Sequence, residues 1–151
     1  VDTFAEKLSD YPFSDSFHES HTYVDYKEDI YVGYRYFETI PGKAEKVVYP
    51  FGYGLSYTTF SIEETDSYIE NDILNVILSV KNTGAVAGKE VVQLYASAPQ
   101  GKLGKPAREL KAFAKTKLLA AGEEEQLELQ LDLNALASYD DLGKVQKSAY
   151  V

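Results

Sequence analysis

Residues 49–60 read Tyr49-Pro50-Phe51-Gly52-Tyr53-Gly54-Leu55-Ser56-Tyr57-Thr58-Thr59-Phe60, and they separate two different kinds of sequence. Proline fixes its own φ angle and glycine permits backbone angles closed to other residues, so this stretch predicts a tight bend. From Tyr57 onward polar and apolar residues alternate, which is typical of a β-strand. The stretch is therefore predicted to join two structural units.

Downstream of this joint, apolar residues recur at every second position, most clearly over 74–80, 92–96 and 127–133. Leucine favours helices, but leucine at alternate positions would wind around a helix, so the alternation predicts half-buried strands. A weaker strand is expected over 110–118, and one short helical turn over 133–139. Turn residues separate the strands at Asn71-Asp72, Asn82-Thr83-Gly84, Pro99-Gln100-Gly101 and Ala121-Gly122.

With the strand that follows the joint, these segments give five strands at the spacing of an immunoglobulin-like domain. The predicted fold class is therefore all-β, an antiparallel β-sandwich that is preceded by an extended, aromatic-rich N-terminal segment.

The residues before the joint are rich in aromatic side chains. Of the 20 Tyr and Phe residues, 14 lie in the first 57 positions. Only residues 29–37 form a run of β-forming residues, so we expect one strand there and irregular structure elsewhere. So many aromatic side chains on so little regular structure would expose apolar surface, and we expect this segment to pack on something larger.

Composition excludes several functional classes. A chain of 151 residues predicts one domain plus an extension. No apolar run reaches the roughly 20 residues that cross a bilayer, so we expect no membrane partner. The net charge of -9 argues against a nucleic-acid partner, which would need a basic face. The chain starts at Val1 and contains no Met, so we expect it to be a piece of a longer protein.

Five segments in register resemble the C-terminal part of glycoside hydrolase family 3 β-glucosidases. Residues 49–60, YPFGYGLSYTTF, resemble the entry into that family's fibronectin type III-like domain, and residues 28–38, EDIYVGYRYFE, resemble the last strand of its α/β sandwich domain. Residues 78–99 are similar to the central sandwich hairpin, residues 108–131 to the two strands after it, and residues 136–144 to the turn before the final hairpin.

The resemblance implies a domain division and a role. Residues 1–56 would be the tail of the α/β sandwich domain with a linker, and residues 57–151 the fibronectin type III-like β-sandwich. The parent protein would hydrolyse terminal β-D-glucosyl residues with retention of configuration, in carbohydrate metabolism. The family's aspartate nucleophile and glutamate acid/base have no counterpart in this chain, so its expected role is structural support of the catalytic domains.

Other readings of the sequence stay open. The family pattern continues past Tyr150-Val151 by at least one strand, so the sandwich is expected to have an open sheet edge through which copies could associate. The chain could instead be an autonomous carbohydrate- or protein-binding β-sandwich module, or a purely structural spacer. Composition alone does not separate these readings.

The charged side chains do not form a pattern that predicts catalysis or metal binding. Glu28-Asp29 and Asp140-Asp141 are pairs in sequence, but neighbours on a strand point to opposite faces, whereas a retaining glycosidase needs two carboxyl groups about 5 to 5.5 Å apart. His18-Glu19-Ser20-His21 lacks the convergent ligands that zinc requires. We expect no catalytic residue, no cofactor and no metal in this chain.

Aromatic side chains supply the only candidates for substrate binding, because their faces are good platforms for sugar rings. These candidates are Tyr31, Tyr34, Tyr36 and Tyr53. The favoured interpretation is that they pack against the α/β domain of the parent, and a carbohydrate groove is the alternative.

The expected partners are the catalytic barrel and α/β domains of the parent chain and, through the parent, a β-glucoside or oligosaccharide. The absence of Cys rules out disulfides and fits a reducing compartment, although bacterial secreted proteins also lack Cys. The sequence thus leaves a bacterial cytoplasmic or secreted location open, with the cytoplasm favoured.

Overall fold

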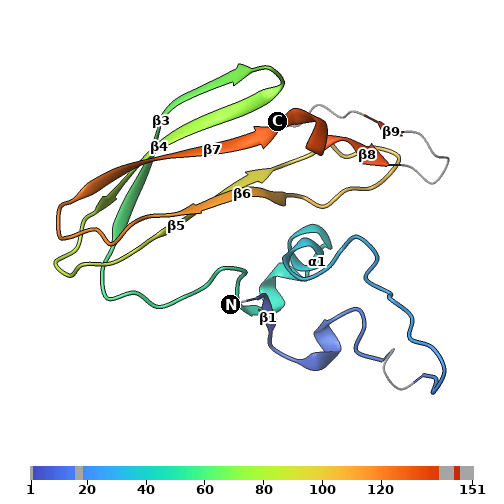
Figure 1. The fold of residues 1–151 in the computed structure, drawn as a ribbon. Coiled ribbons are helices and arrows are strands. Elements are labelled where there is room, and N and C mark those ends of the chain that lie inside the picture. The colour runs from blue at the N-terminus through green and yellow to red at the C-terminus, as the bar shows by residue number, and fades with distance from the viewer. Residues whose placement is uncertain (1, 16–18, 140–144, 147–151) are drawn as a thin grey trace. The chain divides into compact units, whose positions relative to one another are not determined.

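The computed structural model of the chain describes residues 2–15, 19–139 and 145–146. The chain divides into two compact units (Figure 1). Val1–Gly54 and Gln100–Glu109 form the first unit, and Leu55–Pro99 and Leu110–Val151 form the second. The loop Gln100–Glu109 thus groups with the N-terminal residues, while a domain boundary between residues 56 and 57 stays a prediction.

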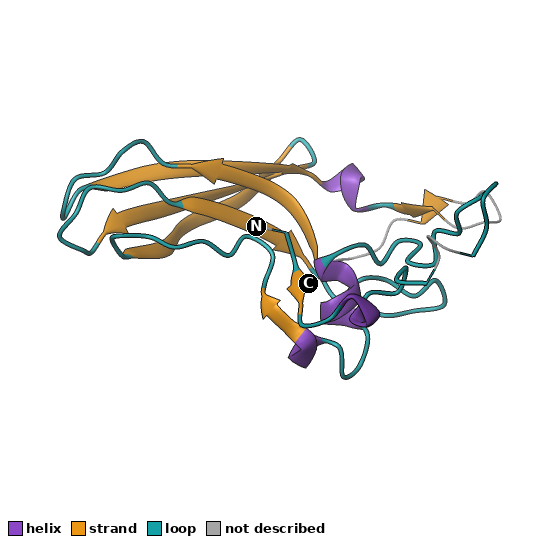
Figure 2. Ribbon diagram, turned by 90° about the horizontal axis from the view of Figure 1, so that it is seen from below, coloured by secondary structure: helices purple, strands orange, loops and turns teal. Residues whose placement is uncertain are grey.

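The second unit is a β-sandwich, which confirms the predicted all-β fold class. One sheet has the antiparallel order β3-β4-β7, formed by Phe60–Glu70, Ile73–Asn82 and Glu124–Asp132. The other sheet pairs β5 (Val91–Ala96) with β6 (Glu109–Lys115). Figures 1 and 2 show these strands as the long arrows of the molecule. All five strands overlap the segments that the sequence predicted as strands.

The strands β3 and β4 form a hairpin with a two-residue turn. Glu70 pairs with Ile73, and Asn71 and Asp72 between them both have positive φ angles, 51° and 63°. Two successive positive φ angles match the right-handed twist of the flanking strands, and Asn and Asp tolerate them better than most residues. The turn predicted from this Asn-Asp pair is confirmed, and β3 extends further than the sequence indicated because it follows β4 to this turn.

The core of the sandwich comes from both sheets. Alternate side chains of β4 face inward together with Leu129 of β7, Val92 of β5, and Leu119. The β4 members are Val76, Leu78 and Val80. Partly buried side chains of β3 and β6 pack against this cluster. Burial of these side chains is the main favourable term that holds the two sheets together.

Asn82, the last residue of β4, has no exposed surface and makes four side-chain hydrogen bonds. Its Oδ1 accepts from Thr58 Oγ1 at 2.6 Å and from the Gly84 amide at 3.0 Å. Its Nδ2 donates to the carbonyl oxygens of Val86 at 2.8 Å and Leu119 at 2.9 Å. One amide side chain therefore fastens three loops at this end of the sandwich.

The first unit has little regular structure, as expected. A two-stranded sheet pairs β1 (Phe4–Ala5) with β2 (Val47–Tyr49). The helix α1 spans Tyr34–Thr39, and single 3-10 turns lie at Leu8–Asp10 and Ala44–Lys46.

The prediction of a strand over residues 29–37 is wrong, because α1 occupies the second half of this range. The same segment was expected to resemble the last strand of an α/β domain. Gly33 precedes α1 with φ 60° and ψ −128°, a combination that only glycine adopts readily, and it turns the chain abruptly. Tyr34 and Phe37 are both buried, and their spacing of three residues places them on one face of the helix. Burial of this pair outweighs the β propensity of the local residues.

The end of the chain forms short elements. A 3-10 turn spans Leu133–Leu136, which confirms the first half of the helical turn predicted over 133–139; its last two residues lie in a strand instead. The Asp132 side chain caps the turn by accepting from the Asn134 amide at 2.8 Å. A short hairpin pairs β8 (Ser138–Tyr139) with β9 (Val145–Gln146). The expected open edge beyond Tyr150-Val151 lies outside the described residues. Among the described residues, no helix has the length and hydropathy of a membrane span.

Candidate functional site

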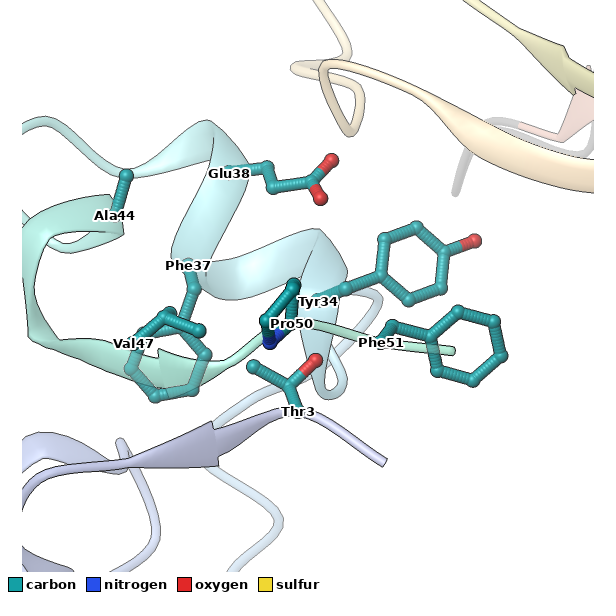
Figure 3. A pocket seen from close by; sticks show the side chains of 8 residues that line it. All are labelled: Thr3, Tyr34, Phe37, Glu38, Ala44, Val47, Pro50 and Phe51. Atoms are coloured by element: carbon teal, nitrogen blue, oxygen red, sulfur yellow. The ribbon is translucent and has the colours of Figure 1, made fainter. Parts of the chain in front are cut away.

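A pocket of about 290 Å³ lies in the first unit between α1 and the two-stranded sheet (Figure 3). It is lined by Thr3, Tyr34, Phe37, Glu38, Ala44, Val47, Pro50 and Phe51. These residues come from the start of the chain, from α1, from β2 and from the bend that follows β2. The lining is mainly apolar, so the pocket is suited to an apolar group.

The bend brings Pro50 and Phe51 to the pocket. The Tyr53 amide donates to the Pro50 carbonyl at 3.0 Å, and Gly52 between them has a φ of 81°. Phe51 then lies against Tyr34, with 5.0 Å between the ring centroids. The Pro-Phe-Gly sequence that predicted a bend therefore also builds one wall of the pocket.

The opposite wall rests on a small aromatic cluster. Phe37 is only 1% exposed, and its ring forms T-shaped pairs with those of Tyr11 and Tyr36, with 5.4 and 5.2 Å between the ring centroids. The Tyr11 hydroxyl in turn donates to the Thr3 carbonyl and accepts from the Ala5 amide. These contacts hold α1 over β1 and fix the position of the pocket.

Two polar side chains reach the pocket. Thr3 is 7% exposed, and its hydroxyl is buried without a hydrogen-bond partner in the described part of the chain. Glu38 supplies the single carboxylate among the lining residues that the structure describes. Arg108 binds it at both oxygens, with 2.7 Å from Nη2 to Oε1. One carboxylate already engaged by a guanidinium does not make the pair of carboxyl groups that retaining hydrolysis needs.

The loop Gln100–Glu109 is fastened to α1 by further contacts. The Ala107 amide donates to Thr39 Oγ1 at 2.9 Å. Arg35 and Glu109 form an ion pair, with 3.9 Å from Arg35 Nε to Glu109 Oε1. With the Arg108 pair, these contacts join residues about 70 positions apart in the sequence, which explains why the loop belongs to the first unit.

The four predicted tyrosines lie in different surroundings. Only Tyr34 lines the pocket. Tyr36 packs against Phe37, and the Lys43 ammonium lies over the Tyr36 ring, 5.7 Å from its centroid. The Tyr53 ring lies tilted against that of Tyr49, with 4.8 Å between the ring centroids. Tyr31 is half-buried, and its hydroxyl lies near Gly104.

Sequence reasoning missed Thr3, Glu38 and Val47 as lining residues of the pocket. No local pattern singles these residues out. The one signal that pointed toward the pocket was the bend at Pro50, which was interpreted only as a joint.

The acidic and histidine candidates do not converge within the described residues. Glu28 and Asp29 lie in a tight turn, where Asp29 has a φ of 49°. Asp140, Asp141 and His18 lie outside the described residues. No group of three or more His, Cys, Asp or Glu side chains that could hold a metal ion occurs in the part of the chain that the structure describes.

Glu19, the carboxylate between the two histidines in the sequence, pairs with a lysine. The Lys27 ammonium donates a hydrogen bond to the Glu19 carboxylate, and this bond raises the pKa of Lys27 above its ordinary value.

A second hollow, of about 480 Å³, lies in the second unit between β6 and β7. Its lining includes Phe113, which is 69% exposed, together with Lys111, Glu128 and Gln130. Gln130 Nε2 donates to Asn75 Oδ1 and to Glu128 Oε1, both at 3.0 Å. This hollow therefore combines an exposed aromatic ring with side chains that are held in place by hydrogen bonds.

Comparison with known proteins identifies the type of domain and its relatives. Residues 90–150 match the family model of the fibronectin type III-like domain. The chain is 54% identical over 99% of its length to β-glucosidase A of Butyrivibrio fibrisolvens, of which it spans 20%.

Solved structures give the same result. A β-glucosidase from Paenibacillus barengoltzii matches 93% of the chain at 53% identity with a TM-score of 0.87, and the chain spans 15% of it. The GH3 β-glucosidase of Bifidobacterium adolescentis matches 97% at 33% identity with a TM-score of 0.83, and the chain spans 21% of it. The chain thus spans about a fifth or less of these relatives.

Proposed function

The chain contains a fibronectin type III-like domain and corresponds to one segment of longer family 3 β-glucosidase chains, and from this premise we propose that it is the non-catalytic C-terminal region of such an enzyme. Its role is to support the domains that carry the reacting groups. The parent would cleave terminal β-D-glucosyl residues with retention of configuration. The partners of this region are the catalytic barrel and the α/β domain of the same parent chain.

A single observation carries this proposal. The chain aligns over nearly its whole length with a β-glucosidase that is about five times longer, since it spans 20% of that relative. The geometry of the first unit is consistent with this role, because its pocket offers one carboxylate bound to Arg108. A retaining mechanism needs a nucleophile and an acid/base on opposite sides of the bond that breaks.

The test is an activity assay with a chromogenic β-glucoside. We expect no turnover above background from the 151-residue chain and turnover from a longer chain that includes it. Turnover by the 151-residue chain itself, retained after removal of trace contaminants, would contradict the supporting role.

A second function is favoured by the hollow beside Phe113. Its exposed aromatic face could stack on the apolar face of a sugar ring, while Lys111, Glu128 and Gln130 provide groups that hydrogen-bond sugar hydroxyls. The chain would then bind β-linked gluco-oligosaccharides without cleaving them.

Titration of a cello-oligosaccharide, followed by NMR shifts of the β6 and β7 amides, tests the binding function. It predicts saturable shifts that Phe113→Ala abolishes and that Tyr68→Ala, at another exposed aromatic side chain, preserves. A supporting domain alone predicts no saturable shifts.

A further inference from the structure

We propose that the pocket beneath α1 receives an apolar side chain from a segment of the parent chain that lies before residue 1, and that a backbone group of the same segment hydrogen-bonds to the Thr3 hydroxyl. This inference rests on the proposed function, because it assumes that the chain is the C-terminal region of a longer protein. It names the contact through which the first unit would be held to that protein.

The size and lining of the pocket select the occupant. Its volume of about 290 Å³ lies at or below the lower limit of pockets for small-molecule ligands, which hold about 300–1,000 Å³. Its walls are the Tyr34–Phe51 ring pair, Phe37 and Val47. A single large apolar side chain matches this space and this surface better than a polar sugar does.

The Thr3 hydroxyl adds a second requirement. It is buried without a partner in the described residues, and burial of an unpaired hydroxyl is destabilising. Its side chain points into the pocket in Figure 3. An occupant that removes this cost must bring a hydrogen-bonding group close to its apolar side chain, and every peptide segment does so through its backbone.

The surface around the pocket supports a peptide occupant. The sheet of β1 and β2 has two strands, and such a sheet is at best marginally stable without further packing. Phe4 on β1 is 57% exposed, and its ring lies against that of Tyr49 of β2, with 6.2 Å between the ring centroids. Apolar surface of this kind, gathered on neighbouring elements, marks an interaction site.

The relatives supply enough chain to cover this surface. The chain spans 20% of the Butyrivibrio fibrisolvens enzyme and 15% of the Paenibacillus barengoltzii enzyme, so at least four-fifths of each relative lies outside the matching region. The occupant is therefore expected within the parent chain, and a separate protein is not needed.

The sharpest test is the sign of the effect of Thr3→Val, a substitution that keeps the shape and removes the hydroxyl. In the 151-residue chain it removes an unpaired buried hydroxyl, so the melting temperature is expected to rise by about 1–3 °C. In the longer chain it removes one partner of a hydrogen bond, so the melting temperature is expected to fall. A rise in both chains would overturn the proposal.

Ala44→Phe tests the apolar part of the contact. Ala44 lines the pocket and is exposed, so the 151-residue chain is expected to accept the larger side chain without loss of melting temperature. The longer chain is expected to lose several degrees, because the new ring competes with the occupant. The matched control is Ala121→Phe, at an exposed turn of the second unit, which is expected to change neither chain.

Equal melting temperatures of the longer chain with and without Ala44→Phe would overturn the proposal, since the pocket would then be empty in the parent. Equal losses in both chains would also overturn it, because the pocket would then be closed even in the short chain. These readouts do not use activity. Thr3→Val could raise the melting temperature of the 151-residue chain and lower that of the longer chain, while the longer chain hydrolyses no β-glucoside. That result would support this inference and refute the proposed enzyme.

Discussion

The two units of the molecule differ in how far they satisfy their own packing requirements. The sandwich has a continuous core of alternate side chains from both sheets, and its buried Asn82 finds four partners within the unit. The first unit buries few side chains, leaves the Thr3 hydroxyl without a partner and exposes aromatic rings on its two-stranded sheet. The core of the sandwich is thus satisfied within its own unit, whereas the first unit, among the described residues, leaves a buried hydroxyl unpaired and aromatic rings uncovered, as expected of a surface that packs on more protein.

The largest effect is expected from Asn82→Ala, which tests whether the sandwich depends on its own internal network. The substitution removes the Asn82 partner of the Val86 carbonyl oxygen, the Gly84 amide and the Thr58 hydroxyl, and each buried group left unpaired costs about 1–3 kcal/mol. The Leu119 carbonyl oxygen loses one of its two bonds and keeps the one from the Gly88 amide. Because the loops can partly relax, we expect a loss of about 4 kcal/mol in the free energy of unfolding, measured by urea denaturation. Lys81→Ala, at the exposed neighbouring residue, is the control. A loss below about 1 kcal/mol would show that the loops do not need Asn82.

Phe37→Ala makes the corresponding test in the first unit. Phe37 is 1% exposed between Tyr11 and Tyr36, so its truncation is expected to remove about 3 kcal/mol of local stability. Limited proteolysis should then cut faster within residues 2–54 and leave the sandwich strands intact.

Phe4→Ala, at an exposed position of β1, is the control for Phe37→Ala and should leave the cleavage rate in the 151-residue chain nearly unchanged. Cleavage that accelerates equally in β4 and β7 would contradict the independence of the two units.

The sequence predicted the sandwich better than the first unit, because the sandwich packs through a regular pattern of its own residues. In β4 and β7 the side chains alternate between a buried and a wet face, so a period of two in the sequence reports the packing directly. The run Ile30-Tyr31-Val32-Gly33-Tyr34, which leads into α1, has strand-forming residues. Gly33 nevertheless turns the chain there, and Tyr34 and Phe37 pack as a helical pair. Contacts with Tyr11 and Phe51, distant in sequence, decide this conformation.

The pocket was less predictable still. Its walls come from residues 3 to 51, and no periodic pattern relates Thr3 to Glu38 or Val47. Tyr34 alone was selected from the sequence, as an aromatic candidate. A cavity of this kind depends on how short irregular segments meet, which is the part of folding that local patterns do not encode.

A smaller effect is expected from Gly84→Ala, which tests the tight packing at one end of the sandwich. A Cβ atom there would lie 2.3 Å from Thr58 Oγ1 and 3.0 Å from the Thr59 backbone nitrogen, so the Thr58 backbone must shift. We expect a loss of about 2 kcal/mol in the free energy of unfolding.

Gly101→Ala in the loop of the first unit is the matched control for Gly84→Ala. Nothing lies within 4 Å of its added Cβ atom, so we expect a change near zero or a small gain. Equal effects at both glycines would refute the difference in packing between the units.

The smallest effect on stability is expected from protonation of the Glu123 carboxylate at low pH. The Ala120 amide and the Lys117 ammonium, 2.8 and 2.9 Å from the Glu123 carboxylate, lower the pKa of Glu123 below its ordinary value of 4.5. Because the folded-state pKa is depressed, this contribution to stability is fully present above pH 4.5 and is lost as the pH falls through the folded-state pKa.

Glu123→Gln should therefore lower the melting temperature slightly at pH 7, by an amount that shrinks as the pH falls through the folded-state pKa, and salt should weaken the effect because the group is exposed. Glu63→Gln, at an exposed position of β3, is the control. A difference between wild type and Glu123→Gln that stays the same as the pH is lowered from 7 would contradict the assignment to the ionised carboxylate.

Hydrogen exchange of the 151-residue chain, compared with exchange of a longer chain that contains it, tests the incompleteness of the first unit most directly. We predict that amides of α1 and β2 exchange much more slowly in the longer chain, because the first unit is then covered. Amides in the middle of β4 and β7 should be equally protected in both chains. Equal protection of α1 and β2 in the two chains would contradict the account, because the first unit would then need no further protein to complete it.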